Sequence, residues 1–327
     1  MSGIVSIRRT LYRIGLLPVH GLRARVISVG NLSMGGTGKT PAVRLMAEYL
    51  QTKGQRVAVL TRGYGRTMPG QKVLLNGQGG WRAVGDEPLM LSRVLPMVPI
   101  VVGRDRVASG RLAVEKFQPR FLILDDGLQY LRLARDVDVV TIDATCPFGN
   151  GRLFPGGILR ENLDALQRAH LFFVTRVNQA ENVDRLVRFL QQTNPRAVVV
   201  QGAYRPSSLT DVNSDKQLSL ESVKGEPVLA MSGIGNPISF ETTLRQLGAR
   251  IAEKLHFPDH HPFLRTEVLA ALKLAEELGA RYVVTTEKDR ARLPIIEKPA
   301  IPVLSMDIRL KVVSGEKQLW QLIERGH

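Results

Sequence analysis

A glycine-rich segment between a short apolar run and a helical pattern most constrains the fold of this chain. Residues 25–29 have the apolar character of a β-strand, residues 33–40 read SMGGTGKT, and a helix is predicted from about residue 39. This order places backbone N–H groups and the positive end of a helix around phosphate oxygens. The segment therefore predicts a nucleotide-binding α/β fold. The alternative is a glycine-rich turn with a chance GKT sequence.

The loop follows the P-loop pattern G-x-x-x-x-G-K-[ST] except at its first position, where Ser33 replaces glycine. Lys39 is predicted to neutralise the β- and γ-phosphates of ATP, and the Thr40 hydroxyl to ligate Mg²⁺. Met34 stands where the partition-type ATPases carry a lysine, which argues against that class. The predicted ATP-binding residues are Ser33, Met34, Gly35, Gly36, Thr37, Gly38, Lys39 and Thr40.

Two pairs of acidic residues are candidates for metal binding and proton transfer. Asp125 and Asp126 follow four apolar residues, which is the Walker B arrangement, although Asp-Asp-Gly also suits a plain turn. Either carboxylate could hold Mg²⁺ directly or through water. Asp86 and Glu87 precede a predicted helix, where Asp86 could simply be an N-cap. Since a kinase also needs a group that accepts the substrate hydroxyl proton, Asp86 is a candidate for that role.

Arginines recur after predicted strands and turns, at Arg62, Arg106 and Arg160, and Glu161 follows the last of them. The carboxyl ends of parallel strands face the ligand crevice of an open α/β sheet, and guanidinium groups suit phosphate recognition. A single arginine is more often a solvated surface charge. Their recurrence at strand ends predicts contacts with phosphate or substrate.

Short apolar strands alternating with helices predict a mostly parallel sheet with helices on both faces, of the P-loop NTPase-like α/β class. We expect a nucleotide-binding domain at residues 25–201, a linker at 202–225 and a smaller α/β domain at 226–327. The second domain carries Asp259 and His260, which are expected to return to the nucleotide cleft; a surface loop or a metal site is the alternative. A carboxylate beside a histidine orients its ring.

The formal charge of +15, from 45 Lys and Arg against 30 Asp and Glu, favours an anionic partner. No recognisable nucleic-acid module is present, and aromatic residues make up only 6%, so no nucleic-acid partner is expected, and no protein partner is evident. Residues 4–17, within the N-terminal segment 1–24, read as an amphipathic helix. It either packs on the domain or lies in a membrane interface, with its arginines toward acidic headgroups. No apolar run is long enough to span a bilayer.

Motifs in a familiar order cover nearly the whole chain: residues 29–41, 62–65, 85–88, 124–129, 131–136, 156–161, 232–237, 259–260 and 286–289. In these segments the chain resembles the tetraacyldisaccharide 4'-kinases, the lipid A 4'-kinases of Gram-negative bacteria. That family shares the missing first glycine of the P-loop, so Ser33 fits the pattern.

The resemblance implies transfer of the ATP γ-phosphoryl group to the 4'-hydroxyl of a tetraacylated disaccharide 1-phosphate, which makes lipid IVA. It also implies Mg²⁺ and a peripheral location at an acidic surface, the cytoplasmic face of the inner membrane. Asp86 would be the catalytic acid/base, assisted by His260. The residues implied at the metal, nucleotide or substrate are Asp125, Asp126, Glu87, Thr40, Gln129, Arg62, Arg106, Arg160 and Glu161.

Two other functions remain open on the residues alone. A P-loop kinase acting on a soluble small molecule would share the phosphate loop and the acidic strand end. A nucleotide switch or a nucleic-acid-associated protein would account for the charge, and its binding would weaken steeply with salt.

Overall fold

The computed structural model describes residues 10–12, 14–67, 69–78, 80–297 and 299–325. The chain forms two compact units: unit 1 comprises Met1–Tyr204 and Leu310–His327, and unit 2 comprises Arg205–Arg309. Half of the predicted amphipathic helix at 4–17 lies outside the described residues; of the described half, residues 10–12 are helical and residues 14–17 form turns and bends. In the described part of the chain, no helix has the length and apolarity needed to cross a bilayer.

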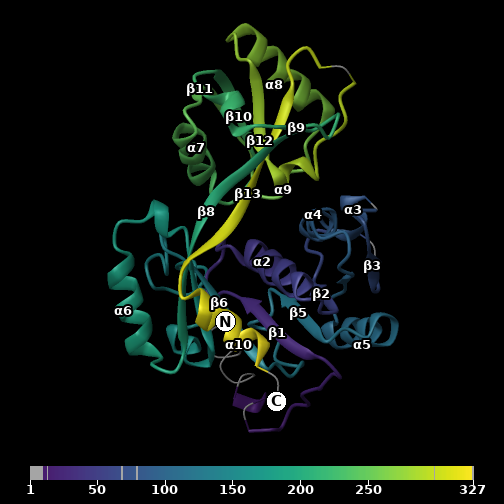
Figure 1. Ribbon diagram of the computed structural model, residues 1–327, viewed down its shortest axis with the longest axis vertical. Coiled ribbons are helices and arrows are strands. Elements are labelled where there is room, and N and C mark those ends of the chain that lie inside the picture. Colours follow the sequence, from purple (N-terminus) through teal and green to yellow (C-terminus); the bar gives the residue numbers. More distant parts are fainter. Residues whose placement is uncertain (1–9, 13, 68, 79, 298, 326–327) are drawn as a thin grey trace. The chain divides into compact units, whose positions relative to one another are not determined.

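Unit 1 is built on a sheet in which β1 has β5 on one side and β6 on the other, all in parallel (Figure 1). At one edge β3 pairs antiparallel with β4. The strands, in order across the sheet, are β3 (Lys72–Leu74), β4 (Ile100–Val102), β2 (Val57–Thr61), β5 (Phe121–Asp125), β1 (Arg25–Gly30), β6 (Val137–Asp143), β7 (Leu171–Thr175) and β8 (Val198–Asp211).

Helices cover both faces of this sheet because alternate residues of its strands point to opposite sides. Apolar residues of β1, β2 and β5 form one cluster with Val107 and Ala113 of α5. The alternate residues, which include Ile27 and Ile123, are fully buried, as is Met46 of α2, which lies against the same strands. The helices of unit 1 are α2 (Lys39–Thr52), α3 (Trp81–Val84), α4 (Asp86–Val94), α5 (Arg106–Phe117), α6 (Val183–Thr193), α10 (Glu316–Glu324) and the 3₁₀ helices η1 (Leu163–Arg168) and η2 (Val177–Gln179).

The last helix, α10, packs on unit 1 beside residues from the start of the chain. The Trp320 ring stacks on the Tyr49 ring of α2, with centroids 3.7 Å apart. The Arg25 guanidinium at the start of β1 donates to the carbonyl of Ile323 at 3.0 Å. Helix α10 falls within the smaller domain predicted at 226–327, but it belongs to unit 1.

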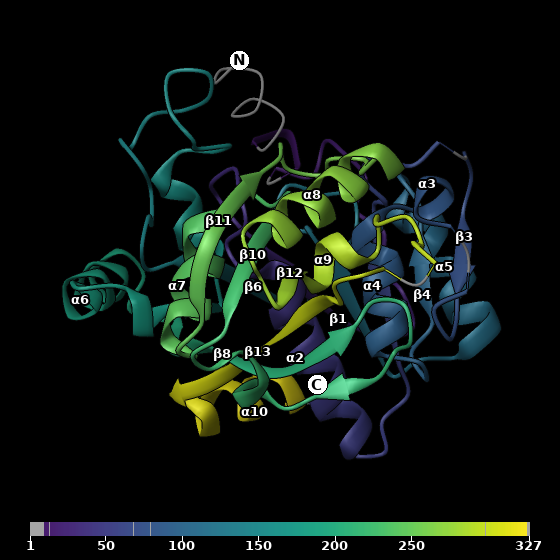
Figure 2. The same ribbon diagram turned by 90° about the horizontal axis from the view of Figure 1, so that it is seen from above.

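Unit 2 repeats the two-faced arrangement on a smaller scale. Helices α7 and α8 lie on opposite sides of β10 (Figure 2). Leu229 and Met231 of β10 pack with α8, whereas Val228 and Ala230 pack with α7. Its strands, in order, are β11 (Arg250–His256), β10 (Pro227–Ser232), β12 (Tyr282–Thr286), β13 (Val303–Ser314) and β8, which also pairs with β9 (Gln217–Leu218). Its helices are α7 (Pro237–Gln246), α8 (Arg265–Glu277), α9 (Glu287–Arg290) and the 3₁₀ helix η3 (Leu220–Val223).

The prediction of a linker at 202–225 is wrong. Strand β8 continues without a break from unit 1 into unit 2, and β13 returns the chain to unit 1. Polar side chains of this segment make cross-strand hydrogen bonds, since the hydroxyls of Ser208 and Thr210 both donate to Asp307 of β13, at 3.0 and 3.1 Å. A segment with several hydroxyl side chains can therefore form a β-strand when the neighbouring strand supplies a hydrogen-bond acceptor for them.

Candidate phosphate-binding site

The glycine-rich loop leads from the end of β1 to the first residue of α2, as predicted. Gly38 caps α2 with a φ of 94°, in the left-handed region that favours glycine, and a Cβ there would lie 2.6 Å from the Tyr204 hydroxyl. The first turn of α2 contains no acidic residue, so no side chain of that turn offsets the positive end of the helix. Lys39 and Thr40 begin this helix. The geometry is that of an anion-binding helix terminus.

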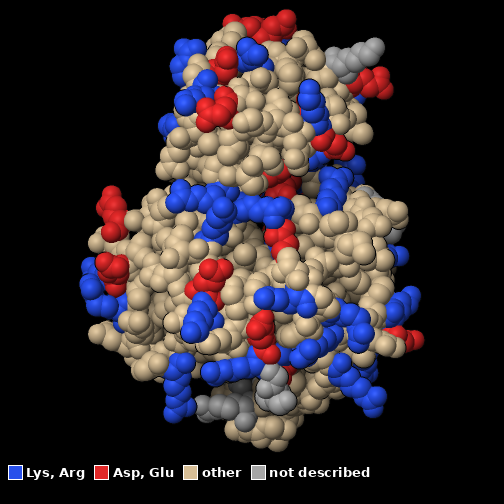
Figure 3. All heavy atoms as spheres, in the orientation of Figure 1, with Lys and Arg blue, Asp and Glu red and all other residues tan. Residues whose placement is uncertain are grey.

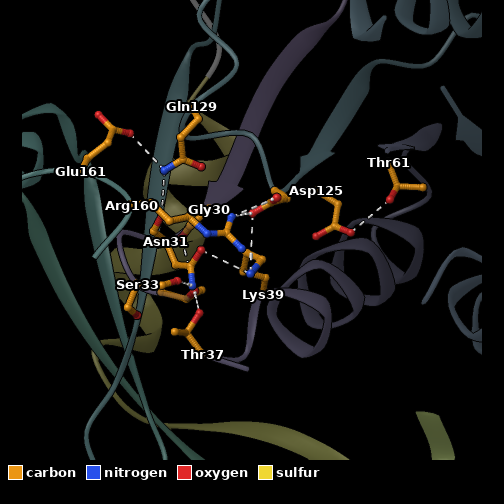
Figure 4. A network of polar contacts seen from close by, with 12 residues as sticks. Gly30, Asn31, Ser33, Thr37, Lys39, Thr61, Asp125, Gln129, Arg160 and Glu161 are labelled. Atoms are coloured by element: carbon orange, nitrogen blue, oxygen red, sulfur yellow. Dashed lines mark hydrogen bonds and ion pairs between the residues drawn. The ribbon is translucent and has the colours of Figure 1, made fainter. Parts of the chain in front are cut away.

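Lys39 and Arg160 come from distant parts of the sequence but lie close together at the P-loop (Figure 4). Both contact the carboxylate of Asp126. The Arg160 guanidinium lies 3.0 Å from an Asp126 oxygen and the Lys39 ammonium 3.6 Å from the same atom. Lys39 also donates to the Asn31 side-chain oxygen at 3.2 Å. Two cations and one carboxylate thus meet at the mouth of the loop.

The segment that carries Arg160 is fastened to the P-loop by its backbone. The N–H of Met34 donates to the carbonyl of Ile158 at 2.7 Å, and the N–H of Arg160 donates to the carbonyl of Leu32 at 2.6 Å. Ser33 and Leu159 form an isolated antiparallel bridge between these two hydrogen bonds. These contacts fix the point of the backbone from which the Arg160 side chain extends. Ser33 takes part in this attachment through its backbone.

Asp125 and Asp126 are adjacent in sequence but differ in environment. Asp125 ends β5 and is buried, and one of its oxygens finds no hydrogen-bond partner among the described residues. Burial, followed by the charges of Glu87 and Asp126, raises the pKa of Asp125 to about 7. Asp126 has a φ of 52° and turns toward the cations. Although burial opposes it, Lys39 and Arg160 hold the pKa of Asp126 below its usual range.

Gln129 and Glu161, both predicted near nucleotide or substrate, brace the loop from its other side. The Gln129 amide donates to the carbonyl of Asn31 at 2.9 Å and to the Glu161 carboxylate at 3.0 Å. Glu161 is 4% exposed and forms an ion pair with Arg168 at 2.8 Å. The Glu161 carboxylate therefore already has two protein partners, which supports a structural contribution at this position.

The predicted base, Asp86, is a buried residue at the start of α4. The N-cap of α4 is Gly85 and not Asp86, so the capping alternative is wrong. One Asp86 oxygen accepts from the backbone N–H of Glu87 at 2.9 Å. Gly63 packs against the segment before Asp86, since a Cβ at Gly63 would lie 2.6 Å from the carbonyl of Val84. The loop that carries the exposed Arg62 thereby reaches this part of unit 1.

Arg106, predicted as a phosphate contact, is 5% exposed at the first residue of α5. Its guanidinium lies 5.0 Å from the centre of the Tyr130 ring, and its Nε has no hydrogen-bond partner among the described residues. Burial, followed by the positive charge of Arg62, lowers the pKa of Arg106. The negative charges of Asp126 and Asp125 act in the opposite direction and favour the charged form of Arg106, so the guanidinium interacts with the carboxylates beside the P-loop.

A group of residues that contacts the P-loop backbone from the neighbouring strands was not predicted from the sequence. Arg176, at the end of β7, donates to the carbonyl of Gly36 at 2.8 Å and pairs with the buried Asp143 at the end of β6. The Thr175 hydroxyl donates to the carbonyl of Thr37 at 2.9 Å, and the Tyr204 ring stacks on Arg176. The signal that could have found these residues is their place at the carboxyl ends of neighbouring parallel strands.

We expect Arg176→Met to destabilise the protein by about 3–5 kcal/mol, because the buried Asp143 carboxylate loses its partner. It should also weaken ATP binding, since the carbonyl of Gly36 loses its donor. Adding Asp143→Leu should restore much of the stability without restoring ATP affinity. Urea unfolding and calorimetric ATP titration measure both effects. Arg188→Met, at an exposed position of α6, is the control. An Arg176→Met variant of unchanged stability would contradict the assignment.

In unit 2 the predicted pair Asp259 and His260 lies beside the first turn of α9. Lys288 contacts both: its Nζ is 3.1 Å from an Asp259 oxygen and 3.2 Å from His260 Nε2. Asp86 belongs to unit 1 and His260 to unit 2, so their pairing stays a prediction. Among the described residues, no group of three or more His, Cys, Asp or Glu side chains is arranged to hold a metal ion by itself.

Comparison with known proteins identifies a single family over the whole chain. The family model described as tetraacyldisaccharide-1-P 4'-kinase matches residues 1–326. The tetraacyldisaccharide 4'-kinase of Anaeromyxobacter sp. (strain K) is 41% identical over 319 residues, covering 96% of this chain and 83% of its own length. That of Syntrophus aciditrophicus (strain SB) is 37% identical over 324 residues, covering 94% and 86%.

A solved structure agrees with the sequence relatives. The crystal structure of LpxK from Aquifex aeolicus in complex with ATP, described as an "apo" form, is 31% identical to this chain. It matches with a TM-score of 0.76 and covers 98% of this chain and 94% of its own. The mostly parallel α/β fold predicted from the sequence is thereby confirmed.

Proposed function

This chain belongs to the tetraacyldisaccharide-1-P 4'-kinase family, and on that premise we propose that unit 1 holds ATP for transfer of its γ-phosphoryl group to the 4'-hydroxyl of a tetraacyldisaccharide 1-phosphate. The chain is an ATP-dependent kinase of lipid A biosynthesis. The observation that carries the proposed site is the convergence of Lys39 and Arg160 at the end of the P-loop. Both cations face a single carboxylate, and a terminal phosphate offers them the same chemistry with more charge.

In this proposal both the backbone and the side chains of the site bind phosphate. The free N–H groups of the loop and the start of α2 bind the β-phosphate region, and Lys39 and Arg160 neutralise the γ-phosphate. The contacts of Asp126 with both cations hold Lys39 and Arg160 at the end of the loop, where they can meet the terminal phosphate.

The residues around Asp125 fit a magnesium ion. Its buried oxygen without a partner, and the carboxylates of Glu87 and Asp126 that raise its pKa, form a site of excess negative charge that a divalent cation would relieve. Asp125, Asp126, Glu87 and Thr40 would hold Mg²⁺, which usually takes one or two protein carboxylates and completes its shell with substrate phosphates and water. When bound, Mg²⁺ spreads the negative charge of the transferred phosphoryl group.

Asp86 is the base in this proposal. One oxygen of its carboxylate accepts the hydrogen bond of the Glu87 N–H at 2.9 Å, and the residue is 4% exposed, so bulk water has little access to it. A buried carboxylate that accepts the hydroxyl proton allows the sugar oxygen to attack without becoming a free alkoxide. His260 of unit 2 is proposed to assist at this step.

Transfer of labelled γ-phosphate from ATP to the disaccharide 1-phosphate lipid, in detergent and with Mg²⁺, tests the function directly. We expect one labelled lipid product whose new phosphate is at the 4' position. Lys39→Ala should reduce its formation by at least about a hundredfold, since the γ-phosphate loses its main cation. Labelling of a soluble sugar but not of the lipid would instead support a small-molecule kinase.

We further propose that the protein binds peripherally to an acidic membrane surface, where its substrate resides. Ile14, Leu16 and Val19 are 58%, 68% and 50% exposed, and the chain carries a net charge of +15. Figure 3 shows basic side chains spread over the face of the molecule in view, with acidic side chains among them. Exposed apolar groups together with excess positive charge are the combination that favours attachment to anionic bilayers.

Replacing Ile14, Leu16 and Val19 by serine should lower binding to phosphatidylglycerol vesicles by about tenfold or more, because each apolar side chain adds about 1 kcal/mol when buried in the interface. Vesicle sedimentation measures the bound fraction. Ile238→Ser, which removes a similarly exposed side chain from unit 2, is the matched control. Equal binding of the triple variant and the parent would refute the role of this segment.

A further inference from the structure

Two motifs of unit 2 that the proposed chemistry leaves without a role meet around His260. They are residues 232–237, after β10, and residues 286–289, at the start of α9. The N–H of Gly233 donates to Asp289 at 3.1 Å, and the carbonyl of Gly233 accepts from the N–H of His260 at 3.3 Å. Both motifs therefore help to place the histidine.

The backbone at His260 is itself unusual. Its φ is 63°, in the left-handed region that residues other than glycine seldom adopt. A residue keeps such a conformation when its surroundings hold it there. The hydrogen bond to Gly233 is one such restraint, and it fixes the point from which the imidazole projects.

Lys288 is the side chain that connects the ring to its neighbouring carboxylate. Its ammonium lies 3.1 Å from an Asp259 oxygen and 3.2 Å from His260 Nε2. The other Asp259 oxygen is 3.8 Å from Nε2, which is too long for a hydrogen bond. At Nε2 the lysine is therefore the nearer of the two partners.

We propose that Lys288 is a positioning residue that holds His260 as the neutral tautomer protonated at Nδ1. A lysine ammonium has three donors and no acceptor, so His260 Nε2 has to accept its hydrogen bond. A neutral imidazole whose Nε2 accepts carries its proton on Nδ1. Asp259 in turn fixes the ammonium through their ion pair.

The consequence for the kinase is a histidine with a defined donor. With Nε2 accepting from Lys288, the proton of the neutral ring is on Nδ1, so Nδ1–H is the donor of this ring. This inference rests on the proposed function in one respect only, namely that His260 assists transfer of the hydroxyl proton. The tautomer of the ring can be measured without any reference to activity.

Nitrogen chemical shifts of the histidine rings test the tautomer. Protein labelled with ¹⁵N-histidine is examined at about pH 9, well above the ordinary histidine pKa and below that of lysine, and His260→Gln identifies the signals. We expect a protonated Nδ1 in the parent and in Lys288→Arg, which keeps a cationic donor. Lys288→Met should shift the proton to Nε2. Lys273→Met, at an exposed position of α8, should leave the pattern of the parent. A proton on Nε2 in the parent, or an unchanged tautomer in Lys288→Met, would overturn the proposal.

Kinetics separate this inference from the proposed function. Lys288→Met should lower kcat by about tenfold to a hundredfold with little change in the KM for ATP, and Lys288→Arg should recover much of the loss. If Lys288 acts through His260, the variant lacking both should turn over no more slowly than His260→Gln alone. Additive losses would overturn the inference. Full activity of His260→Gln would instead remove His260 from the proposed mechanism, and the tautomer measurement would still decide the role of Lys288.

Discussion

Asp86→Asn is expected to lower kcat by about a hundredfold to ten-thousandfold, the range that a positioned general base contributes. Asparagine has the shape of aspartate and can still accept the hydrogen bond from the Glu87 N–H, so α4 should begin as before. The amide cannot take up the hydroxyl proton. The loss should therefore appear in kcat, whereas the P-loop and its contacts to ATP stay intact.

Steady-state assays with the lipid acceptor and calorimetric titration with ATP measure the two halves of this prediction. Asp184→Asn, at an exposed position in the first turn of α6, removes one carboxylate from unit 1 and should change neither quantity. An Asp86→Asn enzyme with near-normal turnover would contradict the assignment of the base. An enzyme that had lost ATP binding would indicate that Asp86 supports the nucleotide site instead.

Asp125→Asn should abolish most of the activity and yet make the metal-free protein more stable at alkaline pH. Burial and the acidic neighbours of Asp125 raise its pKa in the folded protein to about 7, whereas the pKa of aspartate in an unfolded chain is about 4. At a pH between these two pKa values, Asp125 keeps its proton in the folded state and has lost it in the unfolded state. The stability due to this group therefore falls as pH rises through that window, and stays low above about pH 7.

Asparagine carries no charge, so the variant avoids this loss. We expect it to exceed the parent by on the order of 2–4 kcal/mol at about pH 8.5 with EDTA present, and to match it near about pH 4. Urea unfolding at both pH values measures the difference. Asp126→Asn is a control of opposite sign, because the pKa of Asp126 lies below its usual range. That variant should be less stable than the parent at neutral pH, and the deficit should shrink in acid. A less stable Asp125→Asn at about pH 8.5 would contradict the account.

The elements that form the phosphate site could be predicted because they depend on local sequence. An apolar run predicts the strand β1, and the helix pattern predicts the start of α2. The glycines between them predict the turn, because glycine readily adopts the positive φ values found there. The sequence could not separate the roles of Asp125 and Asp126, because a turn decides which of two adjacent carboxylates meets the cations. That separation appears only when Arg160, fixed to the P-loop by its backbone, reaches Asp126.

The residues that were missed act through contacts between distant strands. Arg176 and Asp143 carry no local motif, and their partners are set by the register of β6 against β7. Lys288 stands in a motif that was recognised, but its contact with His260 depends on how α9 follows β12. The error at residues 202–225 has a related cause. Hydroxyl-rich sequence is typical of linkers, but here the segment begins within β8, and two of its hydroxyls donate to Asp307 of β13.

The return of β13 and α10 to unit 1 has a consequence for how the protein is made. Because the chain leaves unit 1 after Tyr204 and comes back at Leu310, the ribosome completes all of unit 2 before it supplies the last pieces of unit 1. The Trp320 ring that covers Tyr49, and the carbonyl that receives Arg25, are therefore synthesised after every residue of unit 2. Until α10 has been made, Tyr49 and Arg25 lack these partners, although all residues of unit 2 have already been joined to the chain. The nucleotide-binding unit is thus the later of the two to be completed.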